Sequence, residues 1–182
     1  ADFTETIPVQ GLLWLTKGGL HVNDVKQHGF GWSERMQRVI MPVYVAGGLV
    51  AVQARSVSKA VTPKYLSQSS VPRPYFRATP VTQTSQGTGQ VVLTEDILSA
   101  ARVGKVNEAW GLLGTNLMDA VITALIERNF DMIHIWMDDD KAGIDARRKM
   151  LVQLKSVGLP ARLIKSDRDP KLHTLQEIKD LL

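Results

Sequence analysis

The sequence contains no cysteine among its 182 residues. Disulfides, thiolate catalysis and cysteine-ligated zinc sites are therefore excluded. The histidines are far apart and lack the paired spacing of zinc ligands; they are His21, His28, His134 and His173. No apolar run approaches the roughly 20 residues that a membrane-spanning helix needs. The first residue is Ala, and no signal segment follows it, so we interpret the chain as a processed product or a piece of a longer protein.

Acidic side chains are missing from residues 35–94, although the net charge of the whole chain is only +4. Residues 1–94 hold nine Lys and Arg against four Asp and Glu, whereas residues 95–182 hold thirteen against fourteen. The acid-free stretch carries seven cations, which are Arg35, Arg38, Arg55, Lys59, Lys64, Arg73 and Arg77. Aromatic residues lie among them, namely Tyr44, Tyr65, Tyr75 and Phe76. This mixture suits a surface that binds nucleic acid, because cations meet phosphates and rings stack on bases. The alternative is a basic domain that is merely soluble.

Two composition changes divide the chain. Residues 37–57 read as two strands rich in Val around Ala46, Gly47 and Gly48, which predicts a β-hairpin. Residues 69–90 are rich in Pro, Ser, Thr, Gly and Gln, which predicts a loop and a domain boundary. We therefore expect a smaller mixed α+β basic subdomain in residues 1–88 and an α/β domain in residues 89–182. The four tryptophans, Trp14, Trp32, Trp110 and Trp136, are expected in the core.

The second half alternates between strand-like and helix-like segments. Apolar strands are predicted at residues 90–94, 109–113, 131–137 and 160–165. Helices are predicted at residues 95–104, 116–129, 139–158 and 172–182, with Asn116 as an N-cap and Gly104 and Gly158 as helix ends. Alternation of this kind is typical of a parallel sheet with helices packed on its faces.

Carboxylates follow three of these predicted strands. Glu95 follows the first, the triplet Asp138-Asp139-Asp140 follows the third, and Asp167 and Asp169 follow the fourth. Ligands of parallel sheets bind beyond the carboxyl ends of the strands, and hard oxygen ligands suit Mg²⁺ or Mn²⁺. Alternation along an extended backbone would point Asp138 and Asp140 together. The alternative is that the triplet only caps the next helix.

These residues resemble the Toprim domain of primases, topoisomerases and some nucleases. Its signature is a Glu after the first strand and Asp-x-Asp after the third, matched here by Glu95 and residues 138–140, with the family-like Ala142-Gly143. Gly114-Thr115 is similar to the second-strand turn of primases. The first half is similar to the amino-terminal subdomain of the RNA polymerase core of bacterial and phage primases. The matching residues are Arg38, Pro42, Gly47, Gly48, Arg55, Pro63, Lys64 and Tyr65.

The resemblance implies a primase polymerase core that makes RNA primers on single-stranded DNA from ribonucleoside triphosphates. Mg²⁺ or Mn²⁺ would be held by Glu95, Asp138 and Asp140, with Asp169 and Asp139 as auxiliary groups. The implied nucleic-acid or nucleotide ligands are Arg38, Arg55, Lys64, Tyr65 and Lys141. The implied partner is a replicative helicase, and the implied compartment is the cytoplasm of a bacterium or of a phage-infected host.

Two departures from the family pattern leave other readings open. Family members usually carry Gly where this chain has Asp96, and often an acid where it has Ser99. Lacking cysteine, the chain has no zinc-binding template reader, and lacking a G-x-x-x-x-G-K-[S/T] loop it has no helicase motor. The alternatives are a Toprim-type metal-dependent nuclease and a template-binding module that has lost catalysis.

Overall fold

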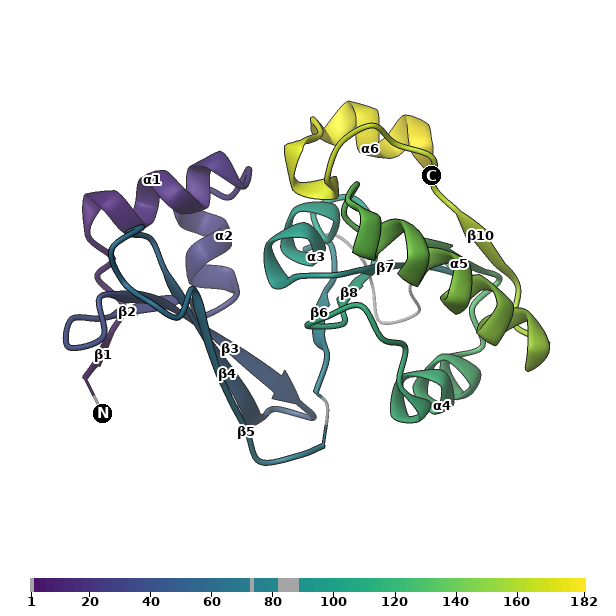
Figure 1. The fold of residues 1–182 in the computed structure, drawn as a ribbon, viewed down its shortest axis with the longest axis horizontal. Coiled ribbons are helices and arrows are strands. Elements are labelled where there is room, and N and C mark those ends of the chain that lie inside the picture. The colour runs from purple at the N-terminus through teal and green to yellow at the C-terminus, as the bar shows by residue number, and fades with distance from the viewer. Residues whose placement is uncertain (1, 73, 82–88) are drawn as a thin grey trace. The chain divides into compact units, whose positions relative to one another are not determined.

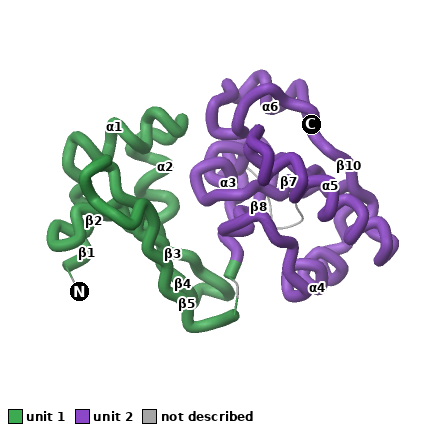
Figure 2. The backbone as a smooth tube through the Cα atoms, viewed as in Figure 1, with its two compact units in different colours: residues 1–74 green, residues 75–182 purple. Residues whose placement is uncertain are grey.

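The computed structural model describes residues 2–72, 74–81 and 89–182 (Figure 1). The chain divides into two compact units, residues 1–74 and residues 75–182 (Figure 2). Each unit has its own sheet and helices. Within the described residues, no helix combines the length and the apolar character that crossing a membrane requires.

The first unit is built on a five-stranded antiparallel sheet whose strands lie side by side in chain order. The strands are β1 (Phe3–Thr4), β2 (Gly31–Ser33), β3 (Arg38–Val45), β4 (Gly48–Ser56) and β5 (Tyr65–Ser69). Between β1 and β2 the chain forms α1 (Val9–Lys17) and α2 (Val22–Gln27). The buried side chains Leu15, Leu20 and Phe30 belong to this helical segment and the residues that flank it.

The predicted hairpin is present as β3 and β4. Its turn places Ala46 and Gly47 at φ values of 48° and 80°, a left-handed conformation that glycine adopts without strain. Pro42 lies in the middle of β3, opposite Val52 of β4. Proline has no N–H to donate, and β3 tolerates it because β2 pairs only with residues 38–40 and has ended before Pro42.

The second unit is built on a sheet with the strand order β10-β9-β7-β8-β6. The strands are β6 (Phe76–Ala78), β7 (Gln90–Thr94), β8 (Ala109–Gly111), β9 (Met132–Ile135) and β10 (Ala161–Leu163). The helices are α3 (Ile97–Val103), α4 (Asp119–Arg128), α5 (Lys141–Ser156), the short 3-10 helix η1 (Pro170–Leu172) and α6 (Leu175–Leu181). Strands β7 to β10 are parallel, as predicted, and β6 is antiparallel to β8.

Both faces of this sheet are covered. Val91 and Leu93 of β7 belong to a core that includes Leu125 of α4 and Met150 of α5. Val92, which points to the opposite face, is also fully buried. Helix α3 packs against β6, β7 and β8. The arrangement is the α/β architecture expected from the alternating segments.

Strand β6 corrects the prediction that residues 69–90 are only loop. Phe76 and Ala78 are buried, and the strand pairs with β8, so residues 75–81 belong to the second unit. The chain passes from the first compact unit to the second between residues 74 and 75, whereas the expected subdomain boundary lay between residues 88 and 89. Residues 82–88 of the predicted loop lie outside the described residues.

Two helix ends also differ from their sequence-based assignments. Helix α4 begins at Asp119 with Met118 in the N-cap position, so Asn116 is not its cap. Helix α3 ends at Gly104 as predicted, but this glycine has φ −57°, so left-handed geometry is not the reason. A Cβ atom there would overlap the Ala78 side chain, and glycine allows α3 to approach β6. Gly158, beyond α5, does have the left-handed φ of 78°.

Candidate functional site

The predicted carboxylates lie at one edge of the second unit's sheet. Glu95 follows β7 directly, and Asp138 lies three residues beyond the end of β9. Asp169 follows β10 and leads into η1. Since β7, β9 and β10 are parallel neighbours, their carboxyl ends meet at the same edge.

Glu95 and Asp138 each have one carboxylate oxygen that is buried and unpaired among the described residues. Glu95 Oε2 and Asp138 Oδ1 are buried, and neither has a hydrogen-bond partner among the described residues. Burial raises the pKa of Glu95 to about 7, and the negative charges of its acidic neighbours act in the same direction. Burial likewise raises the pKa of Asp138 to about 6, against the opposing charge of Lys171. A buried anionic oxygen without a donor is costly, and a cation is the partner that removes the cost.

Asp140 has a second task, at the start of α5. Its Oδ1 accepts a hydrogen bond of 2.8 Å from the Gly143 backbone N–H, which makes it the N-cap. Gly143 is needed because a Cβ at this position would overlap the backbone carbonyl oxygen of Asp138. The capping alternative is thus correct for Asp140. It does not account for Asp138, which caps nothing.

Lys171 of η1 is the group that sequence reasoning missed. Its ammonium lies 2.9 Å from Asp96 Oδ2, 3.2 Å from Asp138 Oδ2 and 3.0 Å from Asp169 Oδ2. Asp96 is also the N-cap of α3, because its Oδ1 accepts a hydrogen bond from the Ser99 backbone N–H. Two features of the sequence hinted at this cluster. One is the cation Lys171, two residues after Asp169, and the other is Asp96, which stands where the resembled family usually has Gly.

The remaining acidic residues are more exposed. Asp139 is exposed, and its backbone N–H donates to Asp169 Oδ1 over 3.2 Å. Asp167 is 85% exposed and pairs with Arg168. Among the described residues, no three side chains of His, Cys, Asp or Glu converge closely enough to hold a metal ion as they stand. The metal site therefore stays a prediction, which the orphaned oxygens of Glu95 and Asp138 favour.

Arg38 is a correction to the predicted phosphate-binding set. Arg38 is only 2% exposed, and its guanidinium donates hydrogen bonds to the carbonyl oxygens of Pro63 (2.6 Å) and Lys64 (3.2 Å). Because the guanidinium is buried and donates to carbonyl oxygens inside the first unit, Arg38 is not available to bind a phosphate at the surface. It instead anchors the segment before β5, which carries Lys64.

Arg55 and Lys64 do lie at the surface of a basic hollow in the first unit. The hollow has a volume of about 450 Å³ and is lined by Trp14, Arg55, Lys59 and Lys64, together with Ser and Thr side chains. The Arg55 guanidinium lies over two rings, 4.7 Å from the centroid of Tyr65 and 5.4 Å from that of Trp14. Its Nε atom is buried without a hydrogen-bond partner among the described residues.

Trp14 lines this hollow and is only partly buried, whereas the other three tryptophans are in the core as predicted.

The other predicted cations are distributed elsewhere. Arg77 belongs to the second unit and pairs with the buried Glu108 over 2.9 Å, so it is not part of the basic hollow. Lys141 is exposed at the first position of α5. Arg35 is exposed after β2, and Arg73 lies outside the described residues.

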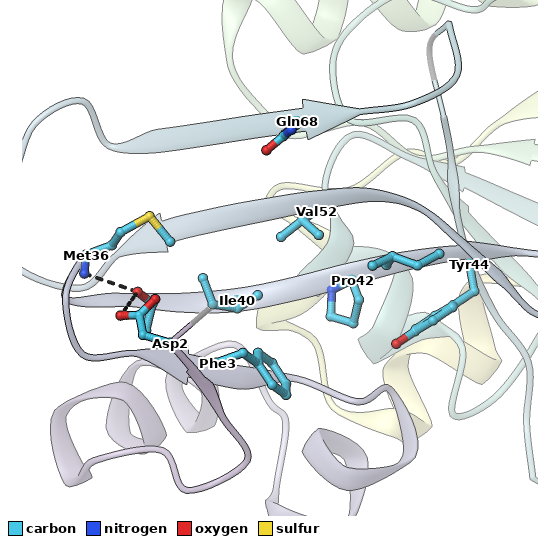
Figure 3. A pocket seen from close by; sticks show the side chains of 10 residues that line it. Asp2, Phe3, Met36, Ile40, Pro42, Tyr44, Val52 and Gln68 are labelled. Carbon is cyan, nitrogen blue, oxygen red and sulfur yellow. Dashed lines mark hydrogen bonds between the residues drawn. The ribbon is translucent and has the colours of Figure 1, made fainter.

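A second hollow in the first unit has a different character (Figure 3). It has a volume of about 360 Å³, and its lining includes Phe3, Ile40, Pro42, Tyr44 and Val52. The only ionisable side chains among its described lining residues are those of Tyr44 and Asp2, and none is a cation. A phosphate would not bind in such a hollow, so the basic hollow is the better candidate for a polyanion.

A comparison with known protein families finds a match over the segment that contains the carboxylate edge. Residues 94–172 match the Toprim-like family model. This segment is a Toprim-like domain. The matched range begins one residue before Glu95 and ends one residue after Lys171, so it contains every carboxylate of the edge described above. No curated protein matches the sequence.

Solved structures extend the likeness to the first unit. The DnaG catalytic core matches with a TM-score of 0.70 at 19% identity, over 93% of this chain and 69% of that one. The primase fragment of the bacteriophage T7 primase-helicase matches with a TM-score of 0.62 at 16% identity, over 91% and 70%. The zinc-binding and RNA polymerase domains of the Aquifex aeolicus primase match at 0.64 and 19%, over 84% and 41%. The chain thus has the fold of primase cores and spans less than half of the Aquifex chain.

Proposed function

We propose that this chain is the polymerase core of a DNA primase, which synthesises RNA primers on single-stranded DNA. The observation that carries the proposal is the pairing of two features in one chain. A Toprim-like domain holds, at its sheet edge, buried carboxylate oxygens that have no partner among the described residues, and the fold of primase cores extends over both units. Each feature alone fits several functions, whereas together they favour primer synthesis.

In the proposed reaction a 3′-hydroxyl attacks the α-phosphate of an incoming ribonucleoside triphosphate. A new phosphodiester bond forms, the bond to the β-phosphate oxygen breaks, and pyrophosphate leaves. Glu95, Asp138 and Asp140 would hold Mg²⁺ or Mn²⁺, with Asp169 beside them. A bound divalent ion lowers the pKa of the attacking hydroxyl and neutralises the triphosphate.

The first unit would supply the grip on the strand or on the triphosphate. Arg55, Lys59 and Lys64 line one hollow and carry the charges that phosphates require. Tyr65 is 38% exposed beside Arg55, which leaves part of its ring for stacking on a base. Lys141 of the second unit is a further candidate for a phosphate contact. We also propose a replicative helicase as partner and the cytoplasm as compartment, because the T7 relative is part of a primase-helicase protein.

A template-binding module without catalysis is the second candidate, and one observation favours it. Lys171 already neutralises carboxylates that a metal would otherwise use. Incubation of the chain with single-stranded DNA, labelled ribonucleotides and Mg²⁺ or Mn²⁺ separates the candidates. Short RNA products are expected. DNA fragments would instead identify a nuclease, and binding without any product would identify the module.

A further inference from the structure

Lys171 is held in the middle of the carboxylate edge. Its ammonium lies within 3.2 Å of three carboxylates, which come from the end of β7 (Asp96), the end of β9 (Asp138) and the start of η1 (Asp169). Only 19% of its side chain is exposed. An ammonium shared by three carboxylates is more than a surface ion pair, because each of these groups is also largely withdrawn from water.

The other oxygens of these carboxylates show what is left for a metal. Asp96 Oδ1 accepts from the Ser99 backbone N–H, and Asp169 Oδ1 accepts from the Asp139 backbone N–H. Asp138 is different, since its Oδ1 is buried and has no partner among the described residues. The same holds for Glu95 Oε2. The buried carboxylate oxygens without a partner among the described residues are therefore Glu95 Oε2 and Asp138 Oδ1, whereas Lys171 pairs with one oxygen each of Asp96, Asp138 and Asp169.

We infer that Lys171 is a built-in cation that takes the place of one metal ion, so that this site binds a single divalent ion and not two. The inference rests on the proposed metal-dependent function. The ammonium repels a divalent ion, so the ion is expected at Glu95, at Asp140 and at Asp138 Oδ1, the Asp138 oxygen that is not paired with Lys171. The three carboxylates around Lys171 keep their negative charges without a second ion.

Counting bound metal ions tests this directly. The full chain is titrated with Mn²⁺, and the free ion is followed by electron paramagnetic resonance. The wild-type chain is expected to bind one Mn²⁺. Lys171→Met removes the charge at similar length and is expected to bind two. Lys171→Gln, which keeps hydrogen-bond donors, has the same expected count and guards against poor folding of the apolar variant. Lys155→Met, on the exposed last turn of α5, is the matched control and is expected to bind one.

The outcomes separate this inference from the function on which it rests. Two ions bound by the wild-type chain, or one ion bound by the wild type and by both Lys171 variants, would overturn the inference and leave a metal-dependent function standing. No ion in any of these proteins would overturn both. Binding by the Lys171 variants alone would also overturn the inference, because the wild-type chain would then bind no ion, and it would remove the metal from the proposed reaction of the wild type.

Thermal unfolding gives a second readout. Without metal, Lys171→Met is expected to melt at a lower temperature than the wild type, because three carboxylates lose their shared counter-ion. With Mn²⁺, its melting temperature is expected to rise by more than that of the wild type. An equal rise in both proteins would contradict the inference, since an ordinary structural ion pair predicts no extra response to metal.

Discussion

At the scale of single residues, Asp138 is the decisive carboxylate of the proposed metal site. One of its oxygens pairs with Lys171 and the other is buried without a partner among the described residues. Asp138→Asn keeps the shape and removes the charge, so we expect primer synthesis to fall by about 100-fold or more, as for lost charge stabilisation in other enzymes. The fold should persist, because the change also relieves repulsion from Glu95. Product formation per minute and circular dichroism measure the two effects.

Asp167→Asn is the control for this change. Asp167 follows β10 and is 85% exposed, and the loss of its charge is expected to leave primer synthesis unaltered. Wild-type synthesis by Asp138→Asn would show that the metal assignment is wrong.

His134 predicts how stability depends on pH. It is 1% exposed, its Nδ1 accepts from Arg162 Nε over 2.9 Å, and its Nε2 lies 3.1 Å from Gln90 Oε1, so the ring is neutral with the proton on Nε2. Burial, followed by the charge of Arg162, lowers the pKa of His134 from 6.5 to about 4. Between these values the unfolded chain takes up a proton that the folded chain does not, so stability falls as the pH drops from 6.5 towards 4.

The full effect of this histidine is about 3 kcal/mol by pH 4, if the pKa difference is converted directly. His134→Gln should therefore lose less stability than the wild type over this pH range. Urea unfolding at half-unit pH steps measures the difference between the two proteins. Parallel curves for both would mean that His134 does not carry the acid sensitivity.

The sequence predicts the place of a residue when neighbouring residues determine it, and does not when partners distant in the sequence determine it. Glu95 and Asp138 were predicted as site residues because they directly follow apolar strands, and the structure places both at the expected sheet edge. The partners of Lys171 include Asp96, 75 residues away, and those of Arg38 lie about 25 residues away. No local pattern announces such pairs. For this reason the sequence alone does not distinguish the buried Arg38 from a surface cation.

At the scale of elements, the contact between α5 and the Asp138 segment depends on one glycine. A Cβ at Gly143 would meet the backbone O, C and N atoms of Asp138, and backbone cannot move aside as a flexible side chain can. Gly143→Ala should therefore destabilise the protein by about 1 to 3 kcal/mol, despite the better helix propensity of Ala. It should also displace Asp138 and reduce primer synthesis.

Asp145→Ala, on an exposed position of the same helix, is the control for Gly143→Ala and should change stability by less than about 0.5 kcal/mol. Denaturant unfolding measures both variants. A Gly143→Ala protein as stable as the wild type would show that α5 does not need this close approach.

Elements with a strong local pattern were predicted, and elements that depend on distant pairing were not. The β3–β4 hairpin and α5 have regular apolar spacing and clear turn or cap residues, and both are present. Strand β6 has only three residues in a segment rich in Pro and Thr, and it exists because β8, about thirty residues later, supplies its hydrogen bonds. Helices α1 and α2 were not predicted.

At the scale of the whole molecule, charge separates the two units. Among the described residues, the cations of the acid-free stretch belong to the first unit apart from Arg77, while the carboxylate edge belongs to the second. A nucleotidyl transferase needs both kinds of surface, since phosphates must be held and a metal must be bound. Chain composition alone located each surface within its half of the sequence. It did not distinguish Arg38, which is buried, from Arg55 and Lys64, which line the basic hollow.

This charge separation predicts how single-stranded DNA binding responds to salt. Substituting Arg55, Lys59 and Lys64 together by Gln should weaken binding for all sequences alike, because phosphate contacts position a strand without reading it. Each lost contact should flatten the slope of log K against log salt by about 0.7, so the triple variant should lose up to about 2. Arg38→Gln is the contrasting variant: it should lower the stability of the first unit, since two carbonyl oxygens lose their donor, and leave the salt slope of the folded protein unchanged. Binding titrations at several salt concentrations measure these slopes. An unchanged slope in the triple variant would move the grip to another cationic surface, of which the Arg147-Arg148-Lys149 cluster on α5 is the next to test.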